Sequence, residues 1–392
     1  MFKILKCLIS SFTLLLLVIS LSSCGGSDSP AATGTLNIKL TDAATPLYRA
    51  VYVTINEVHV HHETGGWEIL GSPELELPRT VDLLELRNGV MLDLGIVELE
   101  AGHYNQMRLI LEDREGAPDP QDPLENNILG EPHPSFNYLI DTDNDDFPLK
   151  VPSGGNTGIK LVNGFDIVAG RANELVIDFD AHRSIVTKGN GNYGLKPTIK
   201  VLETVDNSVS GTVVREDDNT AAVEGAFISA QIYNPDAENP RDEVVEETNT
   251  VTASDGTYTL LLPLNTYNIV ATMIGYLPVC KELEAEWYFA NDPADFTLAE
   301  ATGTITISGN VSGLGNDVAA LLSIRQHDVN CGGTENVTIE VASDLVADGG
   351  SFNFILPAGS TYDLVVSAKD ELTQVFEFED ISTDVVQDID FN

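Results

Sequence analysis

The stretch Leu-Pro-Leu-Asn-Thr-Tyr-Asn at residues 262–268 decides the fold, because the chain contains it three times in variant form. Leu-Glu-Ala-Gly-His-Tyr-Asn stands at 99–105, and Leu-Pro-Ala-Gly-Ser-Thr-Tyr-Asp stands at 356–363. Each copy places a turn between an apolar residue and a tyrosine, and an alternating segment follows. The last two copies are also preceded by related segments, Asp-Gly-Thr-Tyr-Thr-Leu at 255–260 and Asp-Gly-Gly-Ser-Phe-Asn-Phe at 348–354. Repeats of about 90 to 100 residues with short strands and glycine turns predict β-sandwich domains and not the shorter units of solenoids.

The spacing of the repeats divides the chain into three predicted domains, at residues 35–204, 207–299 and 303–392. The last two also begin alike, with Val-Ser-Gly-Thr-Val at 209–213 and Ile-Ser-Gly-Asn-Val at 307–311. We therefore predict an all-β protein of three tandem β-sandwich domains. Arranged in line, three such domains would span very roughly 100 Å.

Alternation of apolar and polar residues predicts the strands of the first domain. Residues 35–40 put Leu36, Ile38 and Leu40 on one face, which is the pattern of a half-buried antiparallel strand. In the next segment the apolar residues at 51, 53 and 55 share a face with those at 58 and 60 only if an extra residue is accommodated near Asn56 and Glu57. This slip predicts a β-bulge. Further strands are expected at 107–111, 175–179 and 198–202, and a short helical turn at 81–87.

The first 26 residues have the organisation of an export signal. Lys3 and Lys6 precede a short apolar run, Phe12 to Leu21, which is too short and wrongly flanked for a stable membrane span. Leu-Ser-Ser-Cys at 21–24 resembles the lipobox of bacterial lipoproteins. The resemblance implies a signal peptide at 1–23, a lipidated Cys24 that opens a flexible tether at 24–34, and a durable anchor made of several acyl chains. An ordinary secretory signal with an incidental cysteine is the alternative.

The position after the lipobox also bears on location. The second residue after Cys24 is Gly26 and not aspartate. By resemblance to the sorting pattern of double-membrane bacteria, this implies a lipid anchor in the outer membrane. A periplasmic and a surface-facing orientation both stay open.

Composition limits the possible partners. The chain carries 61 acidic against 20 basic residues, a formal net charge of −41. This acidity argues strongly against nucleic acid or anionic lipid as partners, because binding their phosphates needs clustered Lys and Arg. Seven of the basic residues nevertheless lie between residues 150 and 200, where they could receive an anionic glycan or pair with nearby carboxylates such as Asp178 and Asp180.

Two cysteines remain after the signal peptide and the anchor are set aside. They are Cys280 and Cys331, in a compartment where a disulfide persists. A bridge that fixes the angle between two domains and a pair of buried free thiols are both compatible with the sequence.

Two family resemblances cover nearly all of the mature chain. The segment from Ser210 to Leu277, with Glu-Gly-Ala at 224–226 and Asp-Gly-Thr-Tyr at 255–258, resembles the carboxypeptidase regulatory-like, transthyretin-like sandwich, and 303–392 resembles a divergent copy. The first domain resembles a bacterial lipoprotein family known as domain of unknown function 4382. The segments that carry this second resemblance lie at 36–43, 51–58, 65–67, 81–86, 101–104 and 149–154. The resemblances imply an exported lipoprotein with spacer or binding modules, and no reaction.

Catalytic motifs are missing from the sequence. None of the seven histidines begins a His-x-x-Glu or His-Glu-x-x-His pattern, and neither a Gly-x-Ser-x-Gly elbow nor a phosphate loop occurs. His59 and His61 project to the same face of a strand and could share a metal, although a solvated polar face is favoured. Asp82 with Glu85, or Asp178 with Asp180, could form a carboxylate pair, but such pairs arise by chance in so acidic a chain.

A weak calcium candidate lies in the segment 141–146. Asp141, Asp143 and Asp145 occupy positions one, three and five of a calcium loop. Asp146 stands where the turn glycine belongs, and Pro152 stands where the closing glutamate belongs. An acidic hairpin turn is therefore favoured.

Together these observations predict a non-enzymatic, lipid-anchored envelope protein that acts as a binding or structural module for a glycan or a protein, without a required cofactor. The alternative is a metal-dependent hydrolase or a calcium-dependent adhesion protein that uses the first domain.

Overall fold

The computed structural model describes residues 32–70, 75–112, 127–131, 133–151, 159–161, 164–189, 191–202, 208–285, 293–315 and 318–392 of the 392-residue chain. The predicted signal peptide, Cys24 and most of the tether lie outside these ranges. No helix within the described residues has the length and apolar character needed to cross a membrane.

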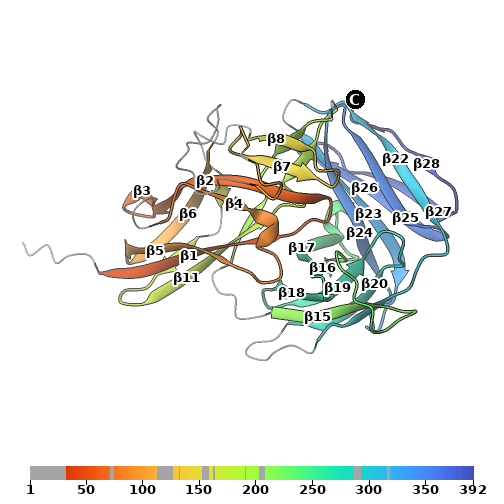
Figure 1. The fold of residues 1–392 in the computed structure, drawn as a ribbon, viewed down its shortest axis with the longest axis horizontal. Helices are drawn as coiled ribbons and strands as arrows, with labels where there is room; N and C mark the ends of the chain where they lie inside the picture. Colours follow the sequence, from red (N-terminus) through yellow and green to blue (C-terminus); the bar gives the residue numbers. More distant parts are fainter. Residues whose placement is uncertain are drawn as a thin grey trace, which may run out of the picture.

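The described chain is almost entirely β, as predicted, and its buried side chains form three large cores. One core runs from Leu36 to Val201, a second from Val209 to Leu298 and a third from Ile305 to Ile389. We call the segments that hold these cores the first, second and third domain. Figure 1 shows the first domain on the left, with the second and third domains beside each other on the right.

The first domain has a four-stranded sheet in the order β14-β11-β1-β5, which faces a second sheet built around β2 and β6. Strand β1 pairs in parallel with β11 and antiparallel with β5. The strands are β1 (Thr33–Ala43), β2 (Tyr48–His62), β3 (Gly66–Leu70), β4 (Arg79–Asp82), β5 (Leu92–Glu100), β6 (Gly102–Leu111), β7 (Tyr138–Asp141), β8 (Asp146–Lys150), β9 (Ile159–Leu161), β10 (Phe165–Ile167), β11 (Ala172–Asp180), β12 (Ile185–Thr187), β13 (Tyr193–Leu195) and β14 (Ile199–Leu202).

The predicted bulge lies in β2. The pairing of β2 with β6 shifts register between Ile55 and Glu57, so that the apolar residues on both sides of the slip reach the same core. The predicted helical turn is the 3₁₀ turn η2 (Leu83–Glu85), and Asp82 caps it by accepting a hydrogen bond from the backbone N of Leu84.

The second and third domains share one topology. In the second, β15 pairs antiparallel with β18 and in parallel with β21, and the facing sheet runs β17-β16-β19-β20. In the third, β22 pairs antiparallel with β25 and in parallel with β28 and β29, and the facing sheet contains β24-β23-β26-β27.

The bounds of these elements follow the internal repeat. The second domain contains β15 (Ser208–Arg215), β16 (Phe227–Tyr233), the 3₁₀ turn η3 (Pro240–Asp242), β17 (Val244–Val251), β18 (Thr257–Leu261), β19 (Thr266–Thr272), β20 (Val279–Glu284) and β21 (Phe296–Leu298). The third domain contains β22 (Thr304–Ser312), β23 (Ala319–Val329), β24 (Val337–Ala347), β25 (Ser351–Pro357), β26 (Ser360–Ala368), β27 (Gln374–Ile381), β28 (Val385–Val386) and β29 (Ile389–Asp390).

The repeated tyrosine has the same role in all three domains. Tyr104, Tyr267 and Tyr362 are buried, and each donates its hydroxyl hydrogen to a backbone oxygen four or five residues upstream. The acceptors are the carbonyl groups of Glu100, Pro263 and Pro357, at 3.1, 3.1 and 2.9 Å. This is the tyrosine corner of sandwich folds, which holds a turn between the two sheets while satisfying a buried hydroxyl.

The repeated Ser-Gly also has a structural cause. A Cβ atom on Gly211 would collide with the carbonyl of Ala294, and one on Gly309 would collide with the carbonyl of Gln387. Glycine is therefore required in the second and third domains, where a segment next to the last strand approaches the first strand.

The three domains do not lie in line, so that expectation is wrong. Thr187 of β12 pairs in parallel with Val346 of β24, which joins the first and third domains into one sheet of 14 strands. Small apolar clusters fill the contacts, with Val186 against Leu345 and Val270 against Ile339. The three domains therefore pack against one another and share buried contacts.

Candidate functional site at the junction of the three domains

Arg183 lies at the point where the three domains meet. It follows β11 of the first domain, and its guanidinium reaches a carboxylate in each of the other two. Nε lies 3.3 Å from Oε1 of Glu246 on β17, and Nη2 lies 2.7 Å from Oε1 of Glu340 on β24. The side chains of Glu246 and Glu340 are 2% and 5% exposed, so this is a buried ion triad.

The electrostatics of the triad depend on its burial. Burial acts to lower the pKa of Arg183, but the charges of Glu340, Glu246 and Asp180 outweigh it and hold that pKa above its usual value. Burial alone would raise the pKa of Glu246, but Arg183 and other neighbours lower it. Arg183 and Glu246 therefore stay charged at neutral pH, and the buried carboxylates depend on the guanidinium.

Excess carboxylates surround the triad. Burial raises the pKa of Asp178 to about 6 against the opposing charge of Lys200. Burial and the charge of Glu246 raise the pKa of Asp180, and burial with nearby aspartates raises that of Asp42. These groups destabilise the junction when ionised, which makes the guanidinium of Arg183 more important to it.

A second arginine forms hydrogen bonds from the third domain to the second. Arg325 on β23 is the largest fully buried side chain of the described residues. It donates to the backbone oxygens of Pro240, Arg241 and Val244 at 2.5, 3.0 and 3.3 Å, around the turn η3. Five guanidinium hydrogens in a fixed fork suit such a cluster of carbonyls, which a lysine could not satisfy.

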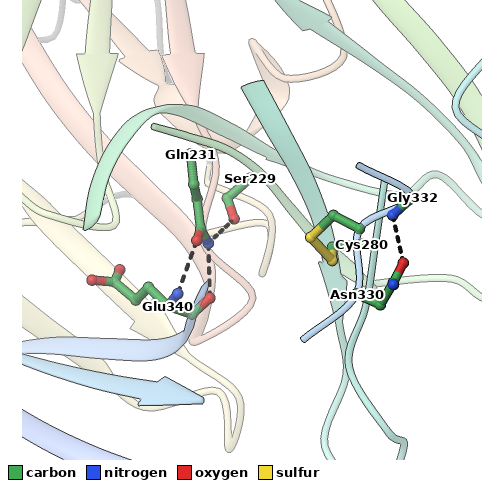
Figure 2. Close-up of a disulfide and its surroundings, with 7 residues drawn as sticks. Ser229, Gln231, Cys280, Asn330, Gly332 and Glu340 are labelled. Carbon is green, nitrogen blue, oxygen red and sulfur yellow. Dashed lines mark hydrogen bonds between the residues drawn. A yellow bond between two sulfur atoms is a disulfide. The ribbon is translucent and has the colours of Figure 1, made fainter. Parts of the chain in front are cut away.

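At the same interface, a side-chain amide forms the pair of backbone hydrogen bonds that a neighbouring strand would form. Gln231 of β16 donates from Nε2 to the backbone oxygen of Glu340 at 2.7 Å, and its Oε1 accepts from the backbone N of Glu340 at 2.8 Å (Figure 2). Ser229 fixes the amide by accepting a hydrogen bond from the same Nε2.

A disulfide also joins the second domain to the third. Cys280 on β20 and Cys331 in the loop after β23 have their sulfurs 1.93 Å apart and their Cα atoms 4.8 Å apart. Figure 2 shows the bridge beside the turn in which Asn330 accepts a hydrogen bond from the backbone N of Gly332. The bond links the second domain to the third covalently and leaves neither cysteine as a free thiol.

The junction opens into a cavity of about 510 Å³. All three domains contribute to its wall, and the cavity lies within the range of 300–1,000 Å³ that is usual for small-molecule sites. We call it the interdomain cleft. Its main apolar lining residues are Leu47, Phe227, Met273, Ile274, Phe354 and Ile355.

Polar groups reach the cleft at a few points. His182, beside Arg183, lies 3.2 Å from Oγ1 of Thr45 through Nδ1 and 3.1 Å from Oγ of Ser343 through Nε2. Burial lowers its pKa, so the imidazole is neutral at pH 7. Arg87, Glu224 and Asp344 also line the cleft.

One known protein family is similar to the first domain. Residues 33–197 match the family model described as "Domain of unknown function (DUF4382)". These residues are similar to that family, and we call them the DUF4382 domain. The match confirms the family resemblance of the first domain, and no curated protein matches the chain.

Three solved structures are similar to this chain at low sequence identity. The Bacillus anthracis TIE protein has a TM-score of 0.18 and 15% identity over 92% of this chain and 51% of its own. The shaft pilin SpaA from Lactobacillus rhamnosus GG has a TM-score of 0.19 and 14% identity, over 47% and 97%. The Streptococcal ancillary pilin has a TM-score of 0.19 and 12% identity, over 91% and 99%. This chain spans about half the length of the Bacillus anthracis TIE protein.

The histidine pair of the DUF4382 domain packs against an indole. The rings of His59 and His61 lie 6.5 and 4.9 Å from the ring of Trp67, on the same face of the sheet as expected from their spacing. His59 pairs with Glu57, and His61 pairs with Asn105. Arg108 lies over the indole, 4.1 Å from its centroid. The face is a polar surface around a half-exposed tryptophan, which we call the Trp67 face.

The calcium candidate of the DUF4382 domain forms a hairpin turn between β7 and β8. Oδ1 of Asp141 accepts hydrogen bonds from the backbone N of Asp143 and of Asp145, both at 2.9 Å. Asn144 has the positive φ of 72° that closes the turn. Across the described ranges, no group of three or more His, Cys, Asp or Glu side chains is arranged to hold a metal ion.

The carboxylate pairs of the DUF4382 domain have structural partners. Asp82 caps η2, Asp178 accepts from Thr248 of the second domain, and Asp180 accepts from the backbone N of Arg183. Two of the basic residues between 150 and 200 form ion pairs with glutamates of other domains. Arg183 pairs with Glu246 and Glu340, and Lys200 pairs with Glu247. The sequence drew attention to Asp178 and Asp180 but gave no sign of their glutamate neighbours.

Proposed function

We propose that this chain is a non-enzymatic envelope protein, lipid-anchored through Cys24, that binds a small ligand with an apolar body in the interdomain cleft. The observation that carries the proposal is the cleft itself, because three domains contribute to its wall and no single domain would form it. Concave, mainly apolar cavities with a few convergent polar groups are the usual form of small-molecule sites. A glycan or envelope protein remains a proposed partner, and the Trp67 face supports it.

The structural roles of the acidic residues support a non-enzymatic protein. Asp82, Asp178 and Asp180 are engaged in capping and in contacts between domains, at positions remote from open solvent. Perturbed carboxylates also occur in structural ion networks, and the triad around Arg183 accounts for them here.

Export to an oxidising compartment is supported by the bridge between Cys280 and Cys331. Replacing Cys24 by serine is expected to release the protein from the membrane fraction, because the acylated thiol is lost. Fractionation of cells that make the wild type and the Cys24→Ser variant, compared by immunoblot, checks this. Equal membrane association of both would contradict the lipid anchor.

The cleft is tested with Nile red, a neutral apolar dye whose fluorescence rises in apolar sites. The Cys24→Ser protein is used throughout, so that neither acyl chains nor detergent take up dye. We expect saturable binding, and we expect Ile355→Arg to weaken it at least tenfold, because a guanidinium on the cleft wall must be desolvated by the dye.

A matched control is Ile96→Arg, at an exposed isoleucine of β5 outside the cleft. This variant is expected to bind Nile red like the parent protein. An equal loss of binding in both variants, or no saturable binding in the parent, would contradict the cleft as the ligand site.

A further inference from the structure

We propose that the interdomain cleft selects ligands that carry a cationic amine, which pairs with the carboxylate of Asp344 while the apolar body lies against Leu47 and Ile355. The inference rests on the proposed function of the cleft and names the chemical class of its ligand.

Asp344 is a carboxylate in the cleft wall without a cationic partner. It lies on β24 and lines the cavity. Among the described residues its hydrogen bond comes from the backbone N of Leu345, at 2.7 Å, and no ion pair reaches it. A carboxylate that is partly removed from water without a counter-charge is costly, and a ligand cation would offset that cost.

The neighbours of Asp344 do not neutralise it. Tyr48 also lines the cleft, and burial, followed by the charge of Asp344, raises the pKa of its phenol. Burial and, to a smaller extent, the charge of Asp344 also raise the pKa of Tyr193. Both phenols are neutral at pH 7, and burial raises the pKa of Asp344 itself to about 6, so the carboxylate is largely ionised at pH 7.5.

The remaining charges of the cleft also favour a cation. Glu224 adds a second carboxylate, and His182 is kept neutral by burial. Arg87 is the cationic residue among those that line the cleft. Its charge acts to lower the pKa of Asp82 in the first domain. Together with the net charge of −41, these groups give the cleft a negative potential that attracts cations.

The apolar part of the wall fits an organic body and not a bare metal ion. Leu47, Ile274 and Ile355 come one from each domain and are 43%, 66% and 42% exposed. Apolar side chains this exposed, gathered around one cavity, offer area that an apolar ligand would cover.

Three probes with one skeleton test the inference: 4-phenylbutylamine, 4-phenylbutanol and 4-phenylbutyrate. In titration calorimetry at pH 7.5 with the Cys24→Ser protein, we expect the amine to bind at least tenfold more tightly than the alcohol, and the butyrate most weakly. Asp344→Asn should remove the advantage of the amine and change the affinity for the alcohol much less than that for the amine. Lowering the pH below 6 should reduce the advantage in the parent protein, because Asp344 becomes protonated.

Asp370→Asn is the matched control, since it removes one exposed carboxylate from a turn of the same domain. It should keep the preference for the amine, and the thermal midpoint of each variant shows that it is folded. Equal affinities for the amine and the alcohol, with both lost in Ile355→Arg, would overturn the selectivity but leave the cleft as a binding site. A preference for the butyrate that Arg87→Gln abolishes would also overturn it. Absence of saturable binding by all three probes would overturn both proposals.

Discussion

Replacing Arg183 by methionine is expected to lower the free energy of unfolding by about 3–5 kcal/mol, the usual cost of removing one partner from a buried ion pair. The long apolar side chain of methionine keeps most of the packing, so the loss comes from Glu246 and Glu340, which would remain buried without a counter-charge. Because all three domains contribute to the triad, we expect them to separate before they unfold. Thermal unfolding followed by calorimetry should change from one transition to several.

Two further variants separate charge from packing. Arg171→Met changes an exposed arginine of the same domain and should have little effect, because exposed substitutions are usually within about 0.5 kcal/mol. Adding Glu246→Gln and Glu340→Gln to Arg183→Met should recover much of the lost stability, since no buried charge is then left unpaired. If Arg183→Met costs no more than Arg171→Met, the triad does not hold the domains together.

Removing the disulfide is expected to have the second largest effect. Cys280 and Cys331 are 51 residues apart, and closing a loop of that length is worth roughly 4 kcal/mol in the chain-entropy model. A Cys280→Ala, Cys331→Ala double variant should therefore have a markedly lower thermal midpoint than the parent. A reductant should lower the midpoint of the parent toward that of the variant and leave the variant unchanged.

Mass spectrometry of non-reduced peptides checks the bond itself. One cross-linked peptide that contains Cys280 and Cys331 is expected, and two alkylatable thiols would show that the bridge is absent. A parent protein whose midpoint does not respond to reductant would contradict its predicted contribution to stability.

Features set by short-range patterns could be predicted from the sequence. The turn-tyrosine repeat indicated sandwich domains because a tyrosine corner needs a turn and a tyrosine at fixed spacing, and Tyr104, Tyr267 and Tyr362 all form one. The bulge near Glu57 could be predicted because a slip in alternation of one residue would otherwise turn Val58 and Val60 away from the core.

The junction could not be predicted, because its partners are distant in sequence. Arg183 contacts Glu246 and Glu340 across separations of 63 and 157 residues, and each is one charged residue among many in an acidic chain. Periodicity shows which face of a strand is buried in its own domain, but it does not show which flank packs against another domain. For the same reason the cleft, whose wall comes from three domains, and the position of Asp344 in it were not visible.

Small-angle X-ray scattering of the Cys24→Ser protein tests most directly whether the three domains form one unit around the junction. A compact chain of this length predicts a radius of gyration of about 20–25 Å, and three domains in line predict about 30 Å or more. We expect the compact value, unchanged between low and physiological salt because the ion triad is buried and weakly screened. A radius of 30 Å or more would contradict the junction, and with it the cleft that the proposed function requires.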